Sequence, residues 1–497
     1  MCAEAAAALA VLSDGNKKNQ DKVAAGGGIE PLVALLVSES SGDFAKEAAA
    51  SALWSLSSGK NYENQVAIAD AGGIPPLVAV LGLVSEKARE KAAGALAALA
   101  LDNMKNELAI AQLIVSLLGS EDKQASAKAA LAVSRFARAH ASNQRSIAKA
   151  GGVELLVSLL DVEDKGANAA TAGPNAALAA LEAAKVQKEM ASALWSMADN
   201  SPDNQAAIAK AGGIQPLIAM LDGHTEGQRD AAGALWALAS SDDNRNLIGT
   251  NGGIAPLVGL LKTGSTGAQE TAAGALHALA ENPDNRVSIA EGHSAFGGGI
   301  PLLVSLFDAG SEEACEQAAG ALTTLVVQNV PNQVATANEA VAMLKRGSAT
   351  AAEHVTQLLR NLAQDPENRA AIAKAGAVPE LVRQLECGSE KSMGMAAQGL
   401  ALIALKSAEH RATVTQELVK LLGSDKAAVR QRASEALTDM AADDNTNSKK
   451  SQGSKKSAGV SGVPLVNLLK DGLKDGRVEA QEYAPRSLLA ISDDRPR

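Results

Sequence analysis

Apolar residues recur at helical spacing along most of the chain, in blocks separated by glycine-rich and polar breaks. In the stretch 204–240, one block carries Ile214, Leu217, Ile218 and Leu221 on one face of a helix. The breaks are a Gly-Gly pair at 212–213, typical of a helix end, and the turn-forming run Asp-Gly-His-Thr at 222–225. The stretch therefore predicts three helices, at roughly 205–211, from 214 onward and from about 226 to 240.

The same pattern is repeated with a constant period. Asn204 to Asn244 is 40 positions, and Asn244 to Asn285 is 41. The third predicted helix of each unit carries an Ala/Leu stripe that one unit cannot bury alone, so neighbouring units must stack into a continuous core.

The repeated unit, NQAAIAKAGGIQPLI followed by AAGALWALA, closely resembles an armadillo repeat. The resemblance implies an all-α, right-handed superhelical solenoid with three helices in each repeat. It also implies a concave groove, lined by the third helices, that takes extended or helical segments of partner proteins. In style the regular repeats are most similar to the vacuole-associated armadillo scaffold proteins.

We expect a single solenoid over residues 1–497, with about eleven repeats after a starting half-repeat. The half-repeat covers 1–14, and the repeats cover 19–58, 64–101, 106–138, 143–199, 204–240, 244–281, 285–327, 332–364, 368–405, 410–442 and 445–493. Repeat 4 contains an insertion, 161–185, that ends in a long alanine-rich helix. Repeats 3 and 8 lack the glycine hinge, so their first two helices are expected to merge or shorten.

Composition narrows the function. The net charge is −10, which disfavours general binding to nucleic acid or to an anionic membrane. Three widely separated cysteines form no CxxC pair, so a disulfide framework or zinc module is not predicted and a reducing, cytoplasmic compartment is expected, with the nucleus as an alternative. No apolar run is long enough to span a bilayer.

No catalytic, cofactor or metal motif is present in the sequence. The six histidines form no HExxH pair, and no phosphate-binding G-x-x-x-x-G-K-(S/T) occurs. We therefore predict a protein that is not an enzyme and needs no cofactor or metal.

The candidate binding residues lie on the third helices, away from the Leu stripe. All three tryptophans occupy one aligned row, and a second row follows four residues later, one helical turn on. The groove residues predicted from the two rows are Trp54, Trp195, Trp236, His277 and Arg360, and then Ser58, Asp199, Ser240, Glu281 and Gln364. Exposed aromatic side chains are frequent anchors in protein interfaces.

Two structural alternatives stay open. The tryptophans could instead pack against neighbouring third helices, since an indole buries a large area. Glycines three residues before the tryptophan row, at Gly94, Gly233, Gly274 and Gly320, indicate either close helix approach or space for a ligand side chain.

The function predicted is a protein-binding scaffold. One alternative is a nuclear import adaptor, but such adaptors carry Trp-x-x-x-Asn on the third helices, and no Asn occurs in the second row here. Another is a substrate-recruiting protein of a ubiquitin ligase. The Lys449–Lys456 tract is either a localisation signal or a solvated loop.

Overall fold

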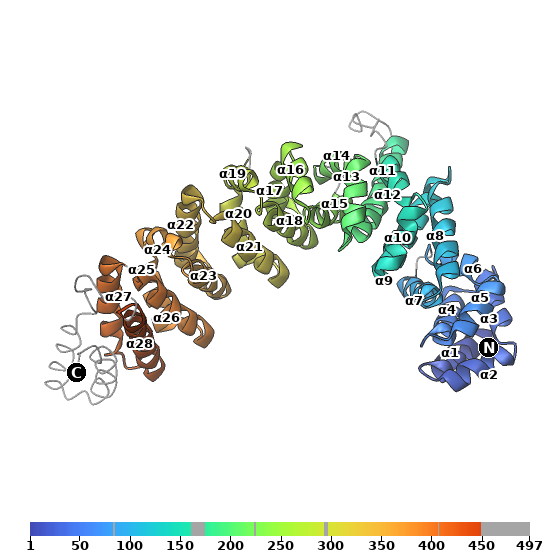
Figure 1. Ribbon diagram of the computed structural model, residues 1–497, viewed down its shortest axis with the longest axis horizontal. Coiled ribbons are helices and arrows are strands. Elements are labelled where there is room, and N and C mark those ends of the chain that lie inside the picture. Colours follow the sequence, from blue (N-terminus) through green and yellow to red (C-terminus); the bar gives the residue numbers. More distant parts are fainter. Residues whose placement is uncertain (83–84, 161–173, 223–224, 293–296, 406, 449–497) are drawn as a thin grey trace. The chain divides into compact units, whose positions relative to one another are not determined.

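The computed structural model describes residues 1–82, 85–160, 174–222, 225–292, 297–405 and 407–448. Every regular element in these ranges is an α-helix, and the 28 helices follow one another in stacked order, which confirms the predicted all-α repeat fold (Figure 1). Helix contacts divide the chain into two units, Met1–Asn282 and Pro283–Arg497, and each is described here by itself.

Seven repeats have three helices. Their first helices are α2 (Lys17–Ala25), α5 (Tyr62–Asp70), α10 (Ala141–Lys149), α13 (Pro202–Lys210), α16 (Asp242–Thr250), α19 (Pro283–Glu291) and α24 (Pro366–Lys374). Their second helices are α3 (Ile29–Val37), α6 (Ile74–Val80), α11 (Gly152–Leu160), α14 (Ile214–Leu221), α17 (Ile254–Thr263), α20 (Gly299–Ala309) and α25 (Ala377–Cys387). Their third helices are α4 (Asp43–Ser57), α7 (Glu86–Ala100), α12 (Pro174–Ala198), α15 (Thr225–Leu238), α18 (Thr266–Leu279), α21 (Glu312–Leu325) and α26 (Glu390–Ala404).

Three repeats have two helices, which confirms the merging expected for repeats 3 and 8, whereas for repeat 10 the prediction of three helices is wrong. In these, one longer helix replaces the first two, and the third helix follows it: α8 (Met104–Leu118) and α9 (Lys123–Ala139), α22 (Val330–Arg346) and α23 (Ala349–Leu362), α27 (Ala408–Leu421) and α28 (Ala427–Ser448). The half-repeat is α1 (Cys2–Ser13). The first two helices of repeats 3, 8 and 10 are merged because the glycine hinge is missing, so the helix continues.

The two hinge glycines at 212–213 show why a Gly-Gly pair ends a helix. Gly212 has φ 84°, a conformation that costs glycine little and other residues more. A Cβ on the next glycine, Gly213, would lie 2.9 Å from Cγ2 of Ile208, a core residue that is fully buried. The first glycine therefore turns the chain, and the second lets the turn pack closely on the core.

Buried asparagines join the start of each repeat to the third helix of the repeat before it. Asn204 is 2% exposed, and its Nδ2 donates to the carbonyl of Met197 near the end of α12, at 2.9 Å. Asparagines at the same place in other repeats donate in the same way, from Asn64 to Leu56, Asn106 to Leu99, Asn143 to Phe136, Asn244 to Leu238, Asn332 to Leu325 and Asn368 to Leu362. The amide satisfies a carbonyl that the helix itself leaves unpaired.

In several repeats the residue after this asparagine joins the first helix of its repeat to the third helix of the same repeat. Nε2 of Gln144 donates to the carbonyls of Ser196 and Asp199, at 2.9 and 3.0 Å, across the boundary between α10 and α12. Within unit 1 the third helices pack in series, α1 on α4, α4 on α7, α7 on α9, α9 on α12, α12 on α15 and α15 on α18. The predicted Leu stripe forms the core, since Leu194, Leu235 and Leu238 are fully buried.

Two predicted regions fall mainly outside the described residues. Residues 161–173 of the repeat 4 insertion are among them, although α12 begins at Pro174 and confirms the long alanine-rich helix. Of repeat 11, only the first residues are described, and there α28 continues to Ser448. The lysine tract and the expected last helix lie beyond it.

Candidate partner-binding groove

The tryptophans of the first row pack on glycines of the following repeat. A Cβ added to Gly233 would lie 2.6 Å from Cδ2 and Cε3 of Trp195. The same close approach joins Gly94 to Trp54 at 2.6 Å and Gly274 to Trp236 at 2.7 Å. One face of each indole therefore lies against the next third helix, in space that a side chain at the glycine would occupy.

The rest of each indole stays accessible. Trp54, Trp195 and Trp236 are all half-buried rather than buried. The guanidinium carbons of Arg138 and Arg229 lie 6.0 and 5.9 Å from the ring centroid of Trp195. The tryptophans therefore pack against the neighbouring third helices, and each ring keeps a remaining surface that solvent reaches.

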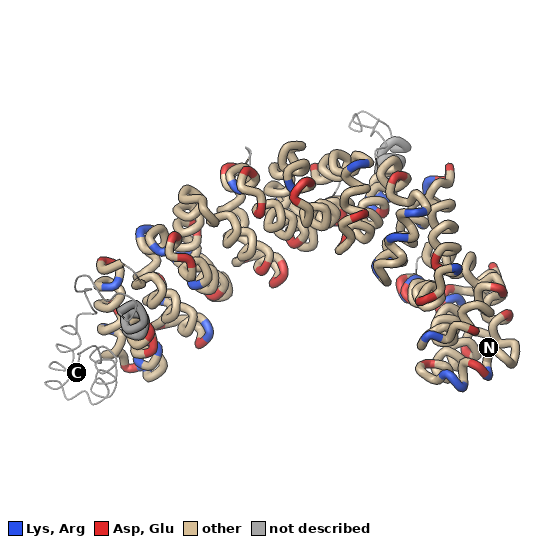
Figure 2. The backbone as a smooth tube through the Cα atoms, viewed as in Figure 1, with Lys and Arg blue, Asp and Glu red and all other residues tan. Residues whose placement is uncertain are grey.

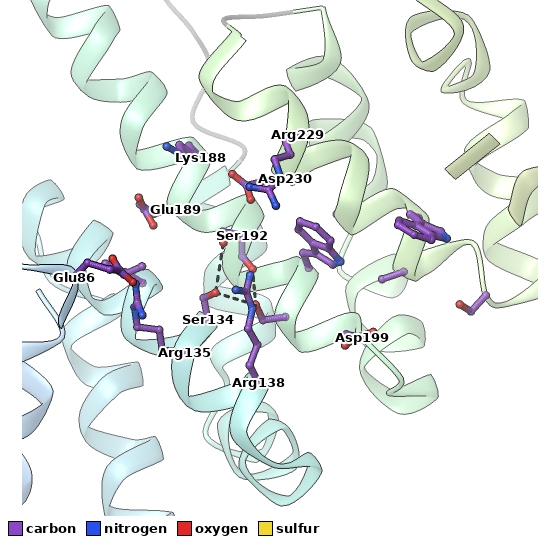
Figure 3. A pocket seen from close by; sticks show the side chains of 16 residues that line it. Glu86, Ser134, Arg135, Arg138, Lys188, Glu189, Ser192, Asp199, Arg229 and Asp230 are labelled. Carbon is purple, nitrogen blue, oxygen red and sulfur yellow. Dashed lines mark hydrogen bonds and ion pairs between the residues drawn. The ribbon is translucent and has the colours of Figure 1, made fainter. Parts of the chain in front are cut away.

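The row is interrupted between α9 and α12. Ser134 occupies the tryptophan position on α9, and its hydroxyl lies 2.8 Å from that of Ser196 and 3.4 Å from that of Ser192 (Figure 3). Nε of Arg138 donates to the Ser196 hydroxyl at 2.9 Å. Small polar side chains therefore stand where the α4–α7, α12–α15 and α15–α18 interfaces place an indole and a glycine.

A pocket of 740 Å³ opens at this interruption, on the side of α7, α9, α12 and α15 that carries the two rows. It is lined by Glu86, Leu131, Ser134, Arg135, Arg138, Lys188, Glu189, Ser192, Trp195, Ser196, Asp199, Arg229, Asp230, Trp236, Ala237 and Ser240. The pocket lies wholly within unit 1. Its volume falls within the usual range for ligand pockets, about 300–1,000 Å³.

The pocket gathers four of the predicted residues, Trp195, Asp199, Trp236 and Ser240. The other predicted residues of unit 1 do not line it: Trp54 and Ser58 belong to α4 and its end, and His277 and Glu281 belong to α18 and its end. In unit 2, Arg360 and Gln364 line a smaller hollow of 380 Å³ together with Asp439.

Charges of both signs line the pocket, and they are mixed along the rest of the described chain as well (Figure 2). Glu86 forms ion pairs with Arg89 and, at 2.7 Å, with Arg135, and these hydrogen bonds hold the pKa of the Glu86 carboxyl below its usual value. The groove is therefore neither uniformly basic nor uniformly acidic.

Two other carboxylates in the pocket have a raised pKa rather than a lowered one. Burial raises the pKa of Glu189 and of Asp230 above their usual values, and for Glu189 the charge of Asp230 adds to the effect. Asp230 is 9% exposed, and neither carboxylate has a hydrogen bond or ion pair within the described part of the chain.

Sequence reasoning missed these charged residues. Glu189 and Asp230 lie six residues before Trp195 and Trp236, and Lys188 and Arg229 lie seven before them. Seven residues are about two helical turns, so the helical period would have placed Lys188 and Arg229 on the same face as the tryptophans. The prediction considered only the turn that follows each tryptophan, toward the C-terminal end of the helix.

The described residues contain no group of three or more His, Cys, Asp and Glu side chains that could hold a metal ion. Over the same ranges, no helix is both long and apolar enough to cross a bilayer.

The family model described as Armadillo/beta-catenin-like repeat matches residues 201–240 and 241–280. No curated protein matches the chain. Two crystal structures of engineered proteins from the Northeast Structural Genomics Consortium are similar to it. One is 29% identical, with 88% of this chain and 94% of the other covered and a TM-score of 0.47. The second is 31% identical, with 51% and 96% covered and a TM-score of 0.35.

None of these comparisons supports the vacuole-associated scaffolds in particular. The two matched repeats, 201–240 and 241–280, correspond to α13–α15 and α16–α18, and the same helix order continues on either side of them. Residues 201–280 of the chain therefore match the armadillo repeat family.

Proposed function

We propose that this chain is a protein-binding scaffold that holds an extended segment of a partner along the third helices of unit 1, centred on the 740 Å³ pocket. The observation that carries the proposal is the meeting of two half-buried tryptophans, Trp195 and Trp236, with charged side chains in one open pocket. Armadillo repeat proteins are in general protein-binding scaffolds, which agrees with this reading.

The side chains that line the pocket indicate which kind of partner segment would bind there. Trp195 and Trp236 offer accessible apolar edges to the partner segment, and such rings are effective anchors because they lose little conformational freedom on binding. Asp199 favours a basic side chain beside them, and Ser240 can hydrogen-bond to the partner's backbone. The mixed charge of the lining fits a segment that carries both signs rather than a polyanion.

Binding without catalysis is the second part of the proposal. The side chains of the pocket are lysine, arginine, carboxylates, serines and aromatics, and its lining contains no histidine or cysteine. The hydroxyls of Ser134 and Ser196 are bonded to each other, Arg138 donates to Ser196, and in the described part of the chain neither hydroxyl is bonded to a histidine or a carboxylate. Such hydroxyls position a ligand rather than attack it.

The test replaces both anchors at once. In a pull-down from cell extract followed by mass spectrometry, Trp195→Ala with Trp236→Ala should reduce recovery of the specific partners by about tenfold or more, since hot-spot truncations cost about 2 kcal/mol or more. Trp54→Ala is the matched control, because it also removes an indole that packs on a glycine but lies outside the pocket. If the double variant kept every partner, the proposal would be wrong.

The same experiment separates the alternative functions. Tight binding of a basic nuclear-localisation peptide to the wild-type protein, lost in the double variant, would favour a nuclear import adaptor. Co-purification of ubiquitin-ligase subunits through a surface other than the pocket would favour a substrate-recruiting role.

A further inference from the structure

The Trp195 ring has an arginine beside it from the third helix on each side. The guanidinium carbon of Arg138, on α9, is 6.0 Å from the ring centroid, and that of Arg229, on α15, is 5.9 Å from it (Figure 3). Nε of Arg138 donates to the Ser196 hydroxyl at 2.9 Å, which helps to fix its guanidinium group. Both arginines are exposed, and within the described residues neither forms an ion pair. Their remaining N–H groups are therefore open to an acceptor on a partner.

Two carboxylates that line the same pocket, Glu189 and Asp230, would weaken the attraction for a bound anion. Burial raises the pKa of both, and the charges of Arg229, Lys188 and Arg138 oppose that shift at Asp230, so all three cations lie near its carboxylate. An acidic side chain beside the Trp195 ring would thus meet three cations and two carboxylates. The balance of charge at this ring favours an anion.

The positions around Trp236 carry the opposite charge. On the preceding third helix the flanking position comes four residues after the tryptophan row, and on the following one it comes four residues before the glycine. Around Trp195 these two positions hold the arginines, whereas around Trp236 they hold Asp199, at the end of α12, and Glu270, on α18. Asp199 is exposed and lines the pocket together with Trp236. In the described part of the chain, no lysine or arginine lies over the Trp236 ring.

Trp54 shows how an indole with acidic neighbours receives a cation. Its flanking position on α7 is Glu90, four residues before Gly94. Nζ of Lys91 lies 5.2 Å from the centroid of the Trp54 ring and 3.3 Å from Oε1 of Glu90. A cation over an indole is a favourable arrangement. The chain supplies this cation itself at Trp54, whereas at Trp236 it supplies the carboxylates alone among the described residues.

We infer that the partner segment places an acidic residue over Trp195 and a basic residue over Trp236. The carboxylate accepts hydrogen bonds from Arg138 or Arg229, and the cation lies over the second indole beside Asp199. Packed helices are about 8–10 Å apart and an extended chain advances about 3.3 Å per residue, so the two residues are two or three positions apart. The inference rests on the proposed function and specifies the charge pattern of the partner segment.

The test uses mixed octapeptide libraries in which two central positions, with one or two mixed residues between them, are fixed. The fixed pairs are Glu with Lys in both orders, Glu with Glu, and Lys with Lys, and fluorescence polarisation measures the affinity. For the wild-type protein, a Glu–Lys pair in at least one order should bind about tenfold better than either like-charged pair, because each of its charges gains a complementary contact.

Reversing the charge around one ring should change the preferred pair. Arg138→Glu with Arg229→Glu gives the Trp195 ring acidic neighbours, so this variant should bind the Lys–Lys pair about tenfold better than the Glu–Lys pair. Arg145→Glu with Lys210→Glu is the matched control. It changes the net charge equally, at exposed positions of α10 and α13 outside the pocket, and should keep the wild-type preference.

A single substitution decides the question if the reversed variant does not fold. Asp199→Lys, at an exposed position, removes a negative charge beside Trp236 and should shift the preference from Glu–Lys toward Glu–Glu. Circular dichroism of each variant shows whether it is folded.

The possible outcomes separate the two proposals. A wild-type preference for a like-charged pair, or a Glu–Lys preference that survives both Arg138→Glu with Arg229→Glu and Asp199→Lys, overturns the inference. Peptide binding that is indifferent to the fixed pair, yet is lost in Trp195→Ala with Trp236→Ala, overturns the inference and supports the proposed function. Failure of every library and of cell-extract proteins to bind the wild type overturns both.

Discussion

The α12–α15 and α9–α12 interfaces use the same two helix positions for opposite purposes. Between α12 and α15, Trp195 and Gly233 close the interface, with the indole against the helix backbone. Between α9 and α12, Ser134 and Ser192 occupy these positions with their hydroxyls 3.4 Å apart, and a pocket opens beside them. The comparison teaches that equivalent positions of a stacked repeat can join two helices either through an indole packed on a glycine or through contacts between small polar side chains.

The largest expected effect is the loss of stability when a side chain replaces Gly233 in the α12–α15 interface. Gly233→Leu forces atoms into the space of the Trp195 ring, where even a Cβ would approach to 2.6 Å, and should lower the free energy of unfolding by about 3 kcal/mol. Ser192→Leu, at the equivalent position beside the pocket, should cost less than about 1 kcal/mol because the added atoms enter open space. Urea unfolding monitored by circular dichroism measures both.

A double variant checks the cause of that difference. Trp195→Ala with Gly233→Leu should be more stable than the sum of the two single effects implies, since removing the indole removes the collision. Additive effects would show that the glycine is needed for a reason other than the indole.

The two interfaces should respond alike to loss of the asparagine that follows each third helix. Asn143 donates to Phe136 at the end of α9, and Asn204 donates to Met197 near the end of α12, both at 2.9 Å. Replacing either with alanine leaves a buried carbonyl unpaired and should cost about 2 kcal/mol. The exposed Asn246→Ala on α16 is the control. Unequal losses at Asn143 and Asn204 would show that the two interfaces also differ in their core.

The smallest expected effect is a dependence of stability on pH. Because burial raises the pKa of Glu189 and Asp230, the folded protein binds more protons than the unfolded chain between the ordinary and the raised pKa values. The free energy of unfolding therefore falls as the pH rises through that window and stays lower at neutral pH. Glu189→Gln with Asp230→Asn should be more stable than wild type at neutral pH, and its advantage should shrink toward pH 4.

Urea unfolding at the two pH values tests this. Glu182→Gln, at an exposed position of α12, is the control and should show no such change. An advantage of the double variant that stayed constant with pH would show that ionisation of these two carboxylates is not its source.

Much of the fold could be predicted from local patterns. The Gly-Gly pairs marked helix ends because a left-handed residue such as Gly212 is local chemistry. The loss of these pairs announced the merged helices α8 and α22. The asparagine at each repeat start served in the sequence only to mark the repeat period. Its buried bond to the end of the preceding third helix depends on how helices dock, which the local pattern does not contain.

The binding site was predicted in part. Aligning the third helices placed Trp195, Asp199, Trp236 and Ser240 together, since residues at one helical position recur on one face. The alignment did not show that the glycine three residues before each tryptophan packs on the indole of the previous repeat. It also gave no role to Ser134, whose hydrogen bond to Ser196 depends on how α9 and α12 dock.

The sequence alone therefore determined the helices, their period and the face of each third helix, because hydrophobic spacing and glycine breaks act within one repeat. Only the tertiary structure decided which ring faces are covered, which carboxylates have their pKa raised by burial and where the pocket opens. These properties belong to pairs of neighbouring repeats, in which residues about 40 positions apart in sequence meet. They depend on the distance between two docked helices, which neither helix specifies by itself.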